Sequence, residues 1–284
     1  MTNIRSWGLI NKLSQKTTII DDKFINLNEK DNIPFGNGRS YGDSCLSNNH
    51  LIKKDKFIKL NQNSGILECS SNILLIEALS KIVPKGWIFY VCPGTSLATV
   101  GGMISSDAHG KNHEKYGSFT NCVKEITVMH SEKKEFICSK NKNADLFYAT
   151  CGGLGLTGFI TSCKLQLRKI KTTNIRSNSI KFFNLKNFLD KFDKDKNEFK
   201  VAWIDGLNFS NNYKILYESA NFDKNSTELQ HKTIQKFKIK FFPTLLLNSF
   251  SIKTFNWFYF NFKKKGNKVY HIYDFLFNLD KIKN

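Results

Sequence analysis

The sequence predicts a mixed fold of β-strands and α-helices whose function lies in glycine-rich loops. Alternating apolar and polar residues over Lys56–Leu60 and Val123–Met129 are typical of half-buried strands. Apolar residues at helical spacing predict a helix over Ile73–Ile82, which Ser70–Asn72 caps and Pro84–Gly86 ends. Hydrophobic residues make up 40% of the 284 positions, which is typical of a globular protein with a substantial core.

The other elements of the first half follow from the same signals. The pair Gly101–Gly102, followed by small residues, predicts a helix within Thr99–His109 that packs closely against a neighbouring element. A short helix is expected over Asp145–Thr150. Further strands are expected at Thr18–Ile20, Phe24–Leu27, Gly65–Cys69, Trp87–Val91, Glu135–Ser139 and Phe159–Leu167.

The composition changes after Arg168, where we place the only domain boundary. Of the 17 glycines, only Gly206 and Gly266 follow that point. We therefore expect one domain over residues 1–170 and a second over residues 171–284. In the second domain, strands are expected at Ile180–Phe183, Val201–Ile204 and Lys214–Tyr217, with a helix over Asn187–Phe192.

The segment His231–Asn284 is basic and aromatic, with 11 lysines, 2 acidic residues and 14 aromatic residues. Lysine beside tryptophan and phenylalanine is a combination that suits contact with a membrane surface. It suits a mobile lid equally well. The formal charge of +19 fits a general bias toward lysine and asparagine, with attraction to nucleic acid, anionic lipid or a phosphorylated substrate as the sharper alternative.

The cysteines indicate a reducing compartment. There are seven, widely spaced, with no Cys-x-x-Cys, which argues against a zinc site or a disulfide framework. Neither a signal-peptide run nor a membrane-spanning apolar stretch occurs in the sequence. We expect a cytoplasmic protein, peripheral at the inner face of the membrane if the basic aromatic segment binds lipid.

The stretch Gly36–Asp43, with three glycines in its first seven residues, predicts a loop that binds an anion. Successive backbone N–H groups in such a loop can form a concave nest for a phosphate. The Gly-x-Ser-x-Gly pattern of a serine hydrolase also fits Gly38–Gly42, but a loop rather than a helix continues after it. A purely structural turn is the other alternative. Neither the dinucleotide fingerprint nor the Walker pattern is present.

The stretch Asp107–His113 concentrates titratable groups. His109 and His113 are four residues apart, a spacing that suits a metal on a helix, but Gly110 and Asn112 disfavour a regular helix and no third ligand follows. We expect no metal. A loop that contacts a cofactor, with Lys111 near a phosphate or an electron-rich ring, is favoured instead.

Seven motifs in order resemble the FAD-linked oxidases of the vanillyl-alcohol-oxidase type, whose FAD-binding domain is called PCMH-type. Within them, the sequence is most similar to the oxidase subunits of decaprenylphosphoryl-β-D-ribose 2′-epimerases. The resemblance extends over essentially the whole chain and is strongest up to about residue 165. The motifs are Gly36–Asp43, Val83–Trp87, Pro93–Thr95, Thr99–Gly102, His109–Asn112, Gly117–Phe119 and Gly152–Gly158.

The resemblance implies an α+β fold, with a two-subdomain FAD-binding domain followed by an incomplete substrate domain. It implies that FAD is held noncovalently, because Arg39 stands where some relatives attach the flavin through a histidine. It places Tyr41, His109 and Lys111 near flavin and substrate as catalytic candidates. The implied cofactor contacts are Gly36, Asn37, Gly38, Arg39, Ser40, Tyr41, Gly94, Thr99, Gly101, Gly102, His109, Gly110, Lys111, Asn112 and Ile160.

The implied reaction is oxidation of a secondary alcohol, with C2 of a lipid-phosphate-linked ribose as the nearest relatives' substrate and an NAD(P)-dependent reductase as partner. The family chains continue beyond the segment that matches Tyr270–Lys283, and their proposed catalytic lysine lies in that continuation. Two alternatives stay open: an FAD-binding chain that is catalytically incomplete, and a basic nucleic-acid-binding protein. No nucleic-acid recognition motif is present, so we expect no nucleic-acid partner.

Overall fold

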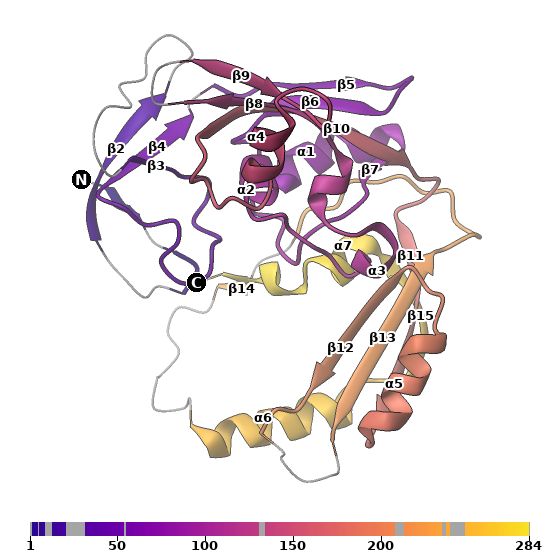
Figure 1. Ribbon diagram of the computed structural model, residues 1–284. Coiled ribbons are helices and arrows are strands. Elements are labelled where there is room, and N and C mark those ends of the chain that lie inside the picture. Colours follow the sequence, from indigo (N-terminus) through magenta and orange to yellow (C-terminus); the bar gives the residue numbers. More distant parts are fainter. Residues whose placement is uncertain are drawn as a thin grey trace. The chain divides into compact units, whose positions relative to one another are not determined.

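The structure is a computed structural model that divides into two compact units, residues 1–170 and residues 171–284. It describes residues 2–4, 6–8, 13–20, 32–53, 55–130, 134–207, 213–234, 237–238 and 248–283. Figure 1 shows both units as mixtures of strands and helices. The expected α+β fold class is confirmed.

A four-stranded sheet at the start of the first unit leads directly into the first glycine loop. Its strands are β1 (Thr2–Ile4), β2 (Leu13–Ile20), β3 (Asn32–Pro34) and β4 (Asn49–Lys53), in the order β1-β2-β4-β3. The expected strand at Thr18–Ile20 is the end of β2. The strand expected at Phe24–Leu27 lies outside the described residues.

A larger antiparallel sheet forms the core of the first unit. Its order is β5 (Ile58–Asn61), β6 (Ile66–Ser70), β10 (Phe159–Lys169), β8 (Val123–Met129) and β9 (Glu135–Cys138), with β7 (Trp87–Phe89) also paired to β10. The helices α1 (Leu75–Ile82), α2 (Val100–Ser105) and α4 (Ala144–Thr150) lie on one side of this sheet in Figure 1. The short helices α3 (His113–Tyr116), η1 (Val83–Lys85) and η2 (Phe119–Cys122) lie in the connections.

Helix α1 forms on the predicted apolar repeat, but the predicted cap at Ser70–Asn72 is wrong, because the N-cap residue is Leu74. Leu75, Leu79 and Ile82 repeat at helical spacing, and all three are completely buried. The side chain of Glu77 accepts a hydrogen bond from the backbone of Leu74 at 2.8 Å, which satisfies a donor at the start of the helix. Gly86, with φ of +77°, ends the turn that follows.

The second unit is built on an antiparallel sheet with the order β12 (Phe199–Ile204), β13 (Ile215–Phe222), β11 (Asn174–Phe182) and β15 (Gly266–His271). The helix α5 (Leu185–Lys194) covers one face of it through Phe188, which packs against Ile215 and Tyr217. The strands β14 (Phe237–Lys238) and β16 (Ile282–Lys283) pair in parallel, and α7 (Ile272–Leu276) and η4 (Asn278–Lys281) lie between β15 and β16.

The helix α6 (Ser249–Phe262) packs on the other face of this sheet. Asn248 caps it, with its side-chain oxygen accepting from Phe250 and Ser251. Ring contacts join Tyr259 to Trp203 and Phe260 to Phe183, at 5.2 and 5.3 Å between ring centroids. In the strand register, Leu216 pairs with Trp203 on one side and with Lys181 on the other, so these three residues lie on one face of the sheet. Their neighbour Tyr217 lies on the opposite face, where it packs against α5.

The sequence predicts the positions of the second unit's strands better than their lengths. β13 extends to Phe222, five residues beyond the expected strand, because Asn221 and Ser219 interrupt the apolar pattern although both pair with β11. The elements α6 and β15 were not predicted. The reason is that aromatic residues surround α6 on nearly all sides, so no apolar stripe marks the helix.

The side chain of Asn256 joins α6 to the end of β12. Its Nδ2 donates to Asp205 at 2.7 Å, and both residues are buried. We predict that Asn256→Ala lowers the free energy of unfolding of the second unit by about 1–3 kcal/mol, because the carboxylate is left buried without this donor.

Denaturant unfolding followed by tryptophan fluorescence, to which Trp203 and Trp257 of the second unit contribute, measures this loss. Asn261→Ala, which removes an exposed side chain on the same helix, is the matched control and is expected to change stability by less than about 0.5 kcal/mol. Equal stability of the two variants would contradict the assigned role of Asn256.

Candidate cofactor site

The first glycine loop, Gly36–Asp43, follows β3 without a helix after it. Gly38 and Gly42 have φ of +60° and +62°, the left-handed region that glycine adopts without strain. The absence of a following helix argues against the nucleophile elbow of a serine hydrolase, which needs a strand-turn-helix context.

The start of the loop lies against the N-terminus of α2. A Cβ atom on Gly36 would lie 2.5 Å from Oγ1 of Thr99, so only glycine fits there. Asn37 fixes the same approach, because its Nδ2 donates to the carbonyl of Leu97 at 2.7 Å. Two predicted cofactor contacts, Gly36 and Thr99, are thereby brought together.

The loop presents unused hydrogen-bond donors. The backbone N–H groups of residues 36–39 donate to no partner within the described part of the chain. The Nε of Arg39 is buried and also lacks a hydrogen bond, while its guanidinium lies 5.5 Å from the ring centroid of Trp7. Consecutive free N–H groups beside an arginine fit a group with negatively charged oxygens, such as a pyrophosphate.

The N-terminus of α2 offers no such donors. Val100 and Gly101 donate to the carbonyls of Ile73 and Ser71, both at 2.8 Å. Gly102 donates to Oγ1 of Thr99 at 3.1 Å. A Cβ on Gly101 would lie 2.8 Å from Cβ of Ser71, which confirms the expected close packing of this helix. Gly101 and Gly102 can therefore offer a cofactor a small surface, whereas the hydrogen bonds must come from the first loop.

The segment His109–Asn112 is held against residues 90–92. A Cβ on Gly110 would lie 2.4 Å from the carbonyl oxygen of Cys92, and Nδ2 of Asn112 donates to the carbonyl of Tyr90 at 2.8 Å. The ring of His109 is exposed and lies 6.1 Å from that of His113 in an edge-on contact. No group of three or more metal-binding side chains occurs among the residues that the structure describes.

Asp107 fixes the turn between α2 and this segment, a role that the sequence pattern does not single out. Its φ of +40° is unusual for a residue with a side chain. Its carboxylate accepts from the backbone of Thr120 at 2.9 Å and from the Thr120 hydroxyl. Burial would raise the pKa of Asp107, but hydrogen bonds from Thr120 and Ser118 outweigh burial and lower it, so the carboxylate is charged at neutral pH.

The loop Gly152–Gly158, the last of the seven sequence motifs, lies beside the C-terminus of α2. Gly152 donates to the carbonyl of Ile104 at 3.0 Å, and Leu154 donates to that of Ser105 at 2.8 Å. A Cβ on Gly155 would lie 3.6 Å from the ring of Pro34, the last residue of β3. The sequence motifs Gly36–Asp43, Thr99–Gly102 and Gly152–Gly158 therefore meet around α2 and the end of β3.

The catalytic candidates are less tightly arranged. The side chain of Tyr41 is 81% exposed, and it makes no hydrogen bond or ring contact with His109 in the described chain. Lys111 is half-buried. Ile160, an expected cofactor contact, lies within β10 and is 6% exposed. Ser40 and Gly94 lie in their predicted loops, and a Cβ on Gly94 would meet nothing within 4 Å.

Six of the seven cysteines are buried, and Cys151 is partly exposed. All seven are free, as expected for a chain without a disulfide framework. Burial raises the pKa of Cys92 and Cys122 to about 12 and that of Cys151 to about 11. Protonated thiols are poor nucleophiles, so none of these three cysteines suits covalent catalysis.

Comparisons with known proteins agree with this geometry. Residues 23–138 match the family described as FAD binding domain. The chain is 28% identical to decaprenylphosphoryl-beta-D-ribose oxidase of Mycolicibacterium smegmatis over 61% of this chain and 39% of the relative. It is 27% identical to cytokinin dehydrogenase 3 of Arabidopsis thaliana over 56% and 29% of the two chains. It is 26% identical to L-gulonolactone oxidase of Mus musculus over 64% of this chain and 41% of the relative.

The chain therefore contains an FAD-binding domain of the PCMH type, and its cofactor is FAD. The resemblance read from the glycine motifs is confirmed at this level. The chain spans less than half the length of each of these three relatives. Within the described residues, no helix combines the length and apolarity needed to cross a lipid bilayer.

We predict that Gly36→Val weakens FAD binding at least about tenfold, equivalent to about 1.4 kcal/mol. The added side chain would collide with Thr99 and displace the free N–H groups of the loop. Flavin absorbance retained after gel filtration, followed by titration of the apoprotein with FAD, measures the change.

Gly206→Ala in the second unit is the control, because a Cβ there meets nothing within 4 Å. Circular dichroism of both apoproteins separates loss of the site from loss of the fold. Full flavin retention in a folded Gly36→Val variant would exclude this loop as the FAD site.

Proposed function

We propose that this chain is an FAD-dependent oxidoreductase that oxidises a secondary alcohol of a sugar. The substrate that we favour is a ribose linked to a polyprenyl phosphate, oxidised at C2. The observation that carries the proposal is the loop at residues 36–39, whose free N–H groups lie in a domain that matches FAD-binding proteins. The choice of a sugar is supported by the similarity to decaprenylphosphoryl-beta-D-ribose oxidase and L-gulonolactone oxidase.

The first loop would hold the pyrophosphate of FAD. The N–H groups of Gly36, Asn37 and Gly38 would donate to its oxygens, and Arg39 would add a positive charge. The hydrogen bond between Asn37 and Leu97 keeps the loop in place before the cofactor binds. Because position 39 is an arginine, the chain has no histidine there to bond the flavin covalently, and we propose noncovalent binding.

When bound, FAD supplies the acceptor for the hydride that leaves the alcohol carbon. The chain must handle the hydroxyl proton and exclude water. His109, with an exposed imidazole ring, is our candidate for accepting that proton. Lys111 would place a positive charge near the developing alkoxide, and Tyr41 would orient the hydroxyl. Asp107 would act through position, because it fixes the turn that carries His109.

A chain that binds FAD but does not complete the reaction is the alternative. The relatives are more than twice as long as the parts matched here. The two proposals share the cofactor and differ in whether a sugar alcohol reduces it.

We predict that the purified chain is yellow and that acid precipitation releases its flavin into the supernatant. Under anaerobic conditions, a phosphate-linked ribose should bleach the flavin absorbance, whereas its 2-deoxy analogue should not, because the analogue lacks the hydroxyl to be oxidised. Flavin that stays in the pellet would contradict noncovalent binding. Flavin that is released but never bleached would favour the incomplete chain.

His109→Gln and Lys111→Gln should slow the bleaching at least about tenfold while the flavin spectrum is kept, within the range expected for a proton-transfer or charge-stabilising group. Lys81→Gln, an exposed position on α1, is the matched control and should keep the full rate. Unchanged rates in both site variants would remove these residues from the mechanism.

A second part of the proposal concerns α6, which we assign as a contact with an anionic lipid surface. Phe255, Phe258 and Phe262 are 63%, 49% and 72% exposed, although they lie three and four residues apart on one helix face. Lys265, which is exposed, follows closely after the end of the helix. Aromatic rings that enter the lipid interface beside lysines that meet anionic headgroups are complementary to such a surface.

We predict that the chain co-sediments with vesicles of phosphatidylcholine and phosphatidylglycerol more strongly than with phosphatidylcholine alone. Replacing Phe258 and Phe262 by serine should weaken this binding about tenfold, or about 1.4 kcal/mol. Leu189→Ser on α5, also exposed, is the control. Equal vesicle binding by the double variant and the parent chain would contradict the lipid contact. If the parent chain is instead a dimer in solution and the double variant is a monomer, the face is a contact with a second copy of the chain.

A further inference from the structure

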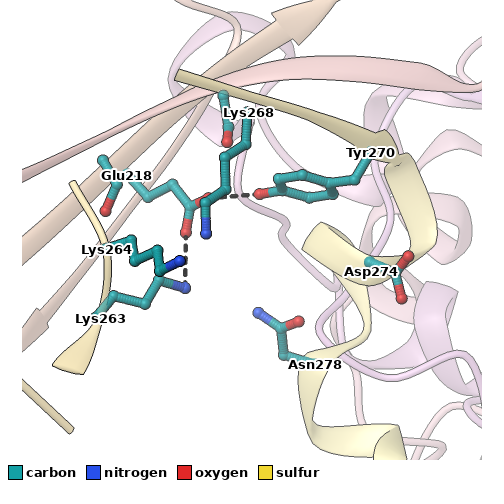
Figure 2. Close-up of a pocket in the computed structure, with 9 residues that line it drawn as sticks. Glu218, Lys263, Lys264, Lys268, Tyr270, Asp274 and Asn278 are labelled. Carbon is teal, nitrogen blue, oxygen red and sulfur yellow. Dashed lines mark hydrogen bonds and ion pairs between the residues drawn. The ribbon is translucent and has the colours of Figure 1, made fainter. Parts of the chain in front are cut away.

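A pocket of about 290 Å³ lies in the second unit, and none of its lining residues belongs to the candidate cofactor site. Ser179 stands opposite Glu218, and Ser177 stands opposite Lys268, so these four residues share one sheet face. This is the face that α6 joins, opposite to α5. Figure 2 shows the lining side chains, which are Ser177, Ser179, Glu218, Lys263, Lys264, Lys268, Tyr270, Asp274 and Asn278.

The carboxylates of the pocket already have partners. Glu218 accepts a hydrogen bond from the hydroxyl of Tyr270 and lies 3.6 Å from Nζ of Lys263, and Figure 2 marks both contacts. Asp274 forms an ion pair with Lys232 at 2.5 Å. These pairings neutralise the two acids, so neither is available as a ligand for a cation.

Two lysines remain in excess. Lys264 and Lys268 line the pocket from the segment after α6 and from β15, and they form no ion pair with any residue that the structure describes. Their charges therefore face the pocket and its opening uncompensated. Lysine heads at a concave surface attract an anion, because the local positive potential is not cancelled by the protein itself.

The wall of the pocket also carries an unused donor. Ser179 is 4% exposed, and its hydroxyl has no hydrogen-bond partner. A buried polar group without a partner is unfavourable, so an oxygen acceptor in the pocket would stabilise this hydroxyl. The Tyr270 hydroxyl does not compete for that acceptor, because it donates to Glu218.

We propose that this pocket is a binding site for an oxyanion, a phosphate or carboxylate group carried by a small ligand. Lys264 and Lys268 neutralise its charge, and the Ser179 hydroxyl donates to one of its oxygens. Glu218 is a positioning residue that holds Tyr270 and Lys263 in the wall. The volume is at the lower end for ligand pockets, which suits one anionic group rather than a whole nucleotide. The proposal concerns the second unit alone and stands whether or not the chain oxidises a sugar.

The test titrates the full FAD-loaded chain with inorganic phosphate in an isothermal calorimeter, while flavin fluorescence reports any displacement of FAD. Saturable binding that leaves the flavin signal unchanged is expected. The double substitution Lys264→Gln with Lys268→Gln should weaken phosphate binding at least tenfold, and Ser179→Ala should weaken it severalfold. Lys186→Gln is the matched control, because Lys186 is exposed on α5, which covers the other face of the sheet. This variant should bind phosphate as tightly as the parent chain does.

A parallel titration with acetate distinguishes the two sources of the oxyanion, since a carboxylate site binds acetate at least as tightly as phosphate. Two results would overturn the proposal: no saturable binding of either anion, or binding that the double lysine variant keeps in full. Unfolding curves of each variant confirm that the second unit is intact.

Discussion

The candidate cofactor site depends on one close approach of two backbones. Gly36 lies so near Thr99 that any side chain on the glycine would occupy the position of the threonine hydroxyl. That hydroxyl is itself needed, because it accepts from Gly102 at the start of α2. The loop cannot move outward without losing the Asn37 bond to Leu97. The free N–H groups of residues 36–39 are therefore held in a conformation that the rest of the unit imposes.

This constraint explains why the donors of α2 and those of the loop have different roles. The first N–H groups of α2 are consumed by Ser71, Ile73 and Thr99, which fixes the helix against the sheet. The backbone N–H groups of residues 36–39 donate to no acceptor in the described part of the chain. A chain normally pairs its buried backbone donors, and Gly38 is buried while Asn37 and Arg39 are partly buried, so their unused N–H groups mark a place for an external acceptor. The pairing pattern thus distinguishes a structural glycine pair from a binding loop.

The sequence predicts the first unit well because glycine reports directly on backbone geometry. The positive φ of Gly38 and the tight packing of Gly101 follow from residues that lack a side chain. It cannot reveal the role of Asp107, which depends on Thr120 reaching back across a turn. It also misses α6, since the helix is aromatic on almost every side and the usual apolar stripe is absent.

The pocket of the second unit could not be predicted from the sequence, because its residues meet only in the folded sheet. Ser179, Glu218 and Lys268 are separated by dozens of residues, and only the register of three strands brings them to one face. A one-residue slip in that register would turn each side chain to the other face of the sheet, toward α5. In the sequence, serine and lysine at such positions are typical of the exposed face of a strand. Their chemistry becomes visible when burial removes the partners that water would supply, as it does for the Ser179 hydroxyl.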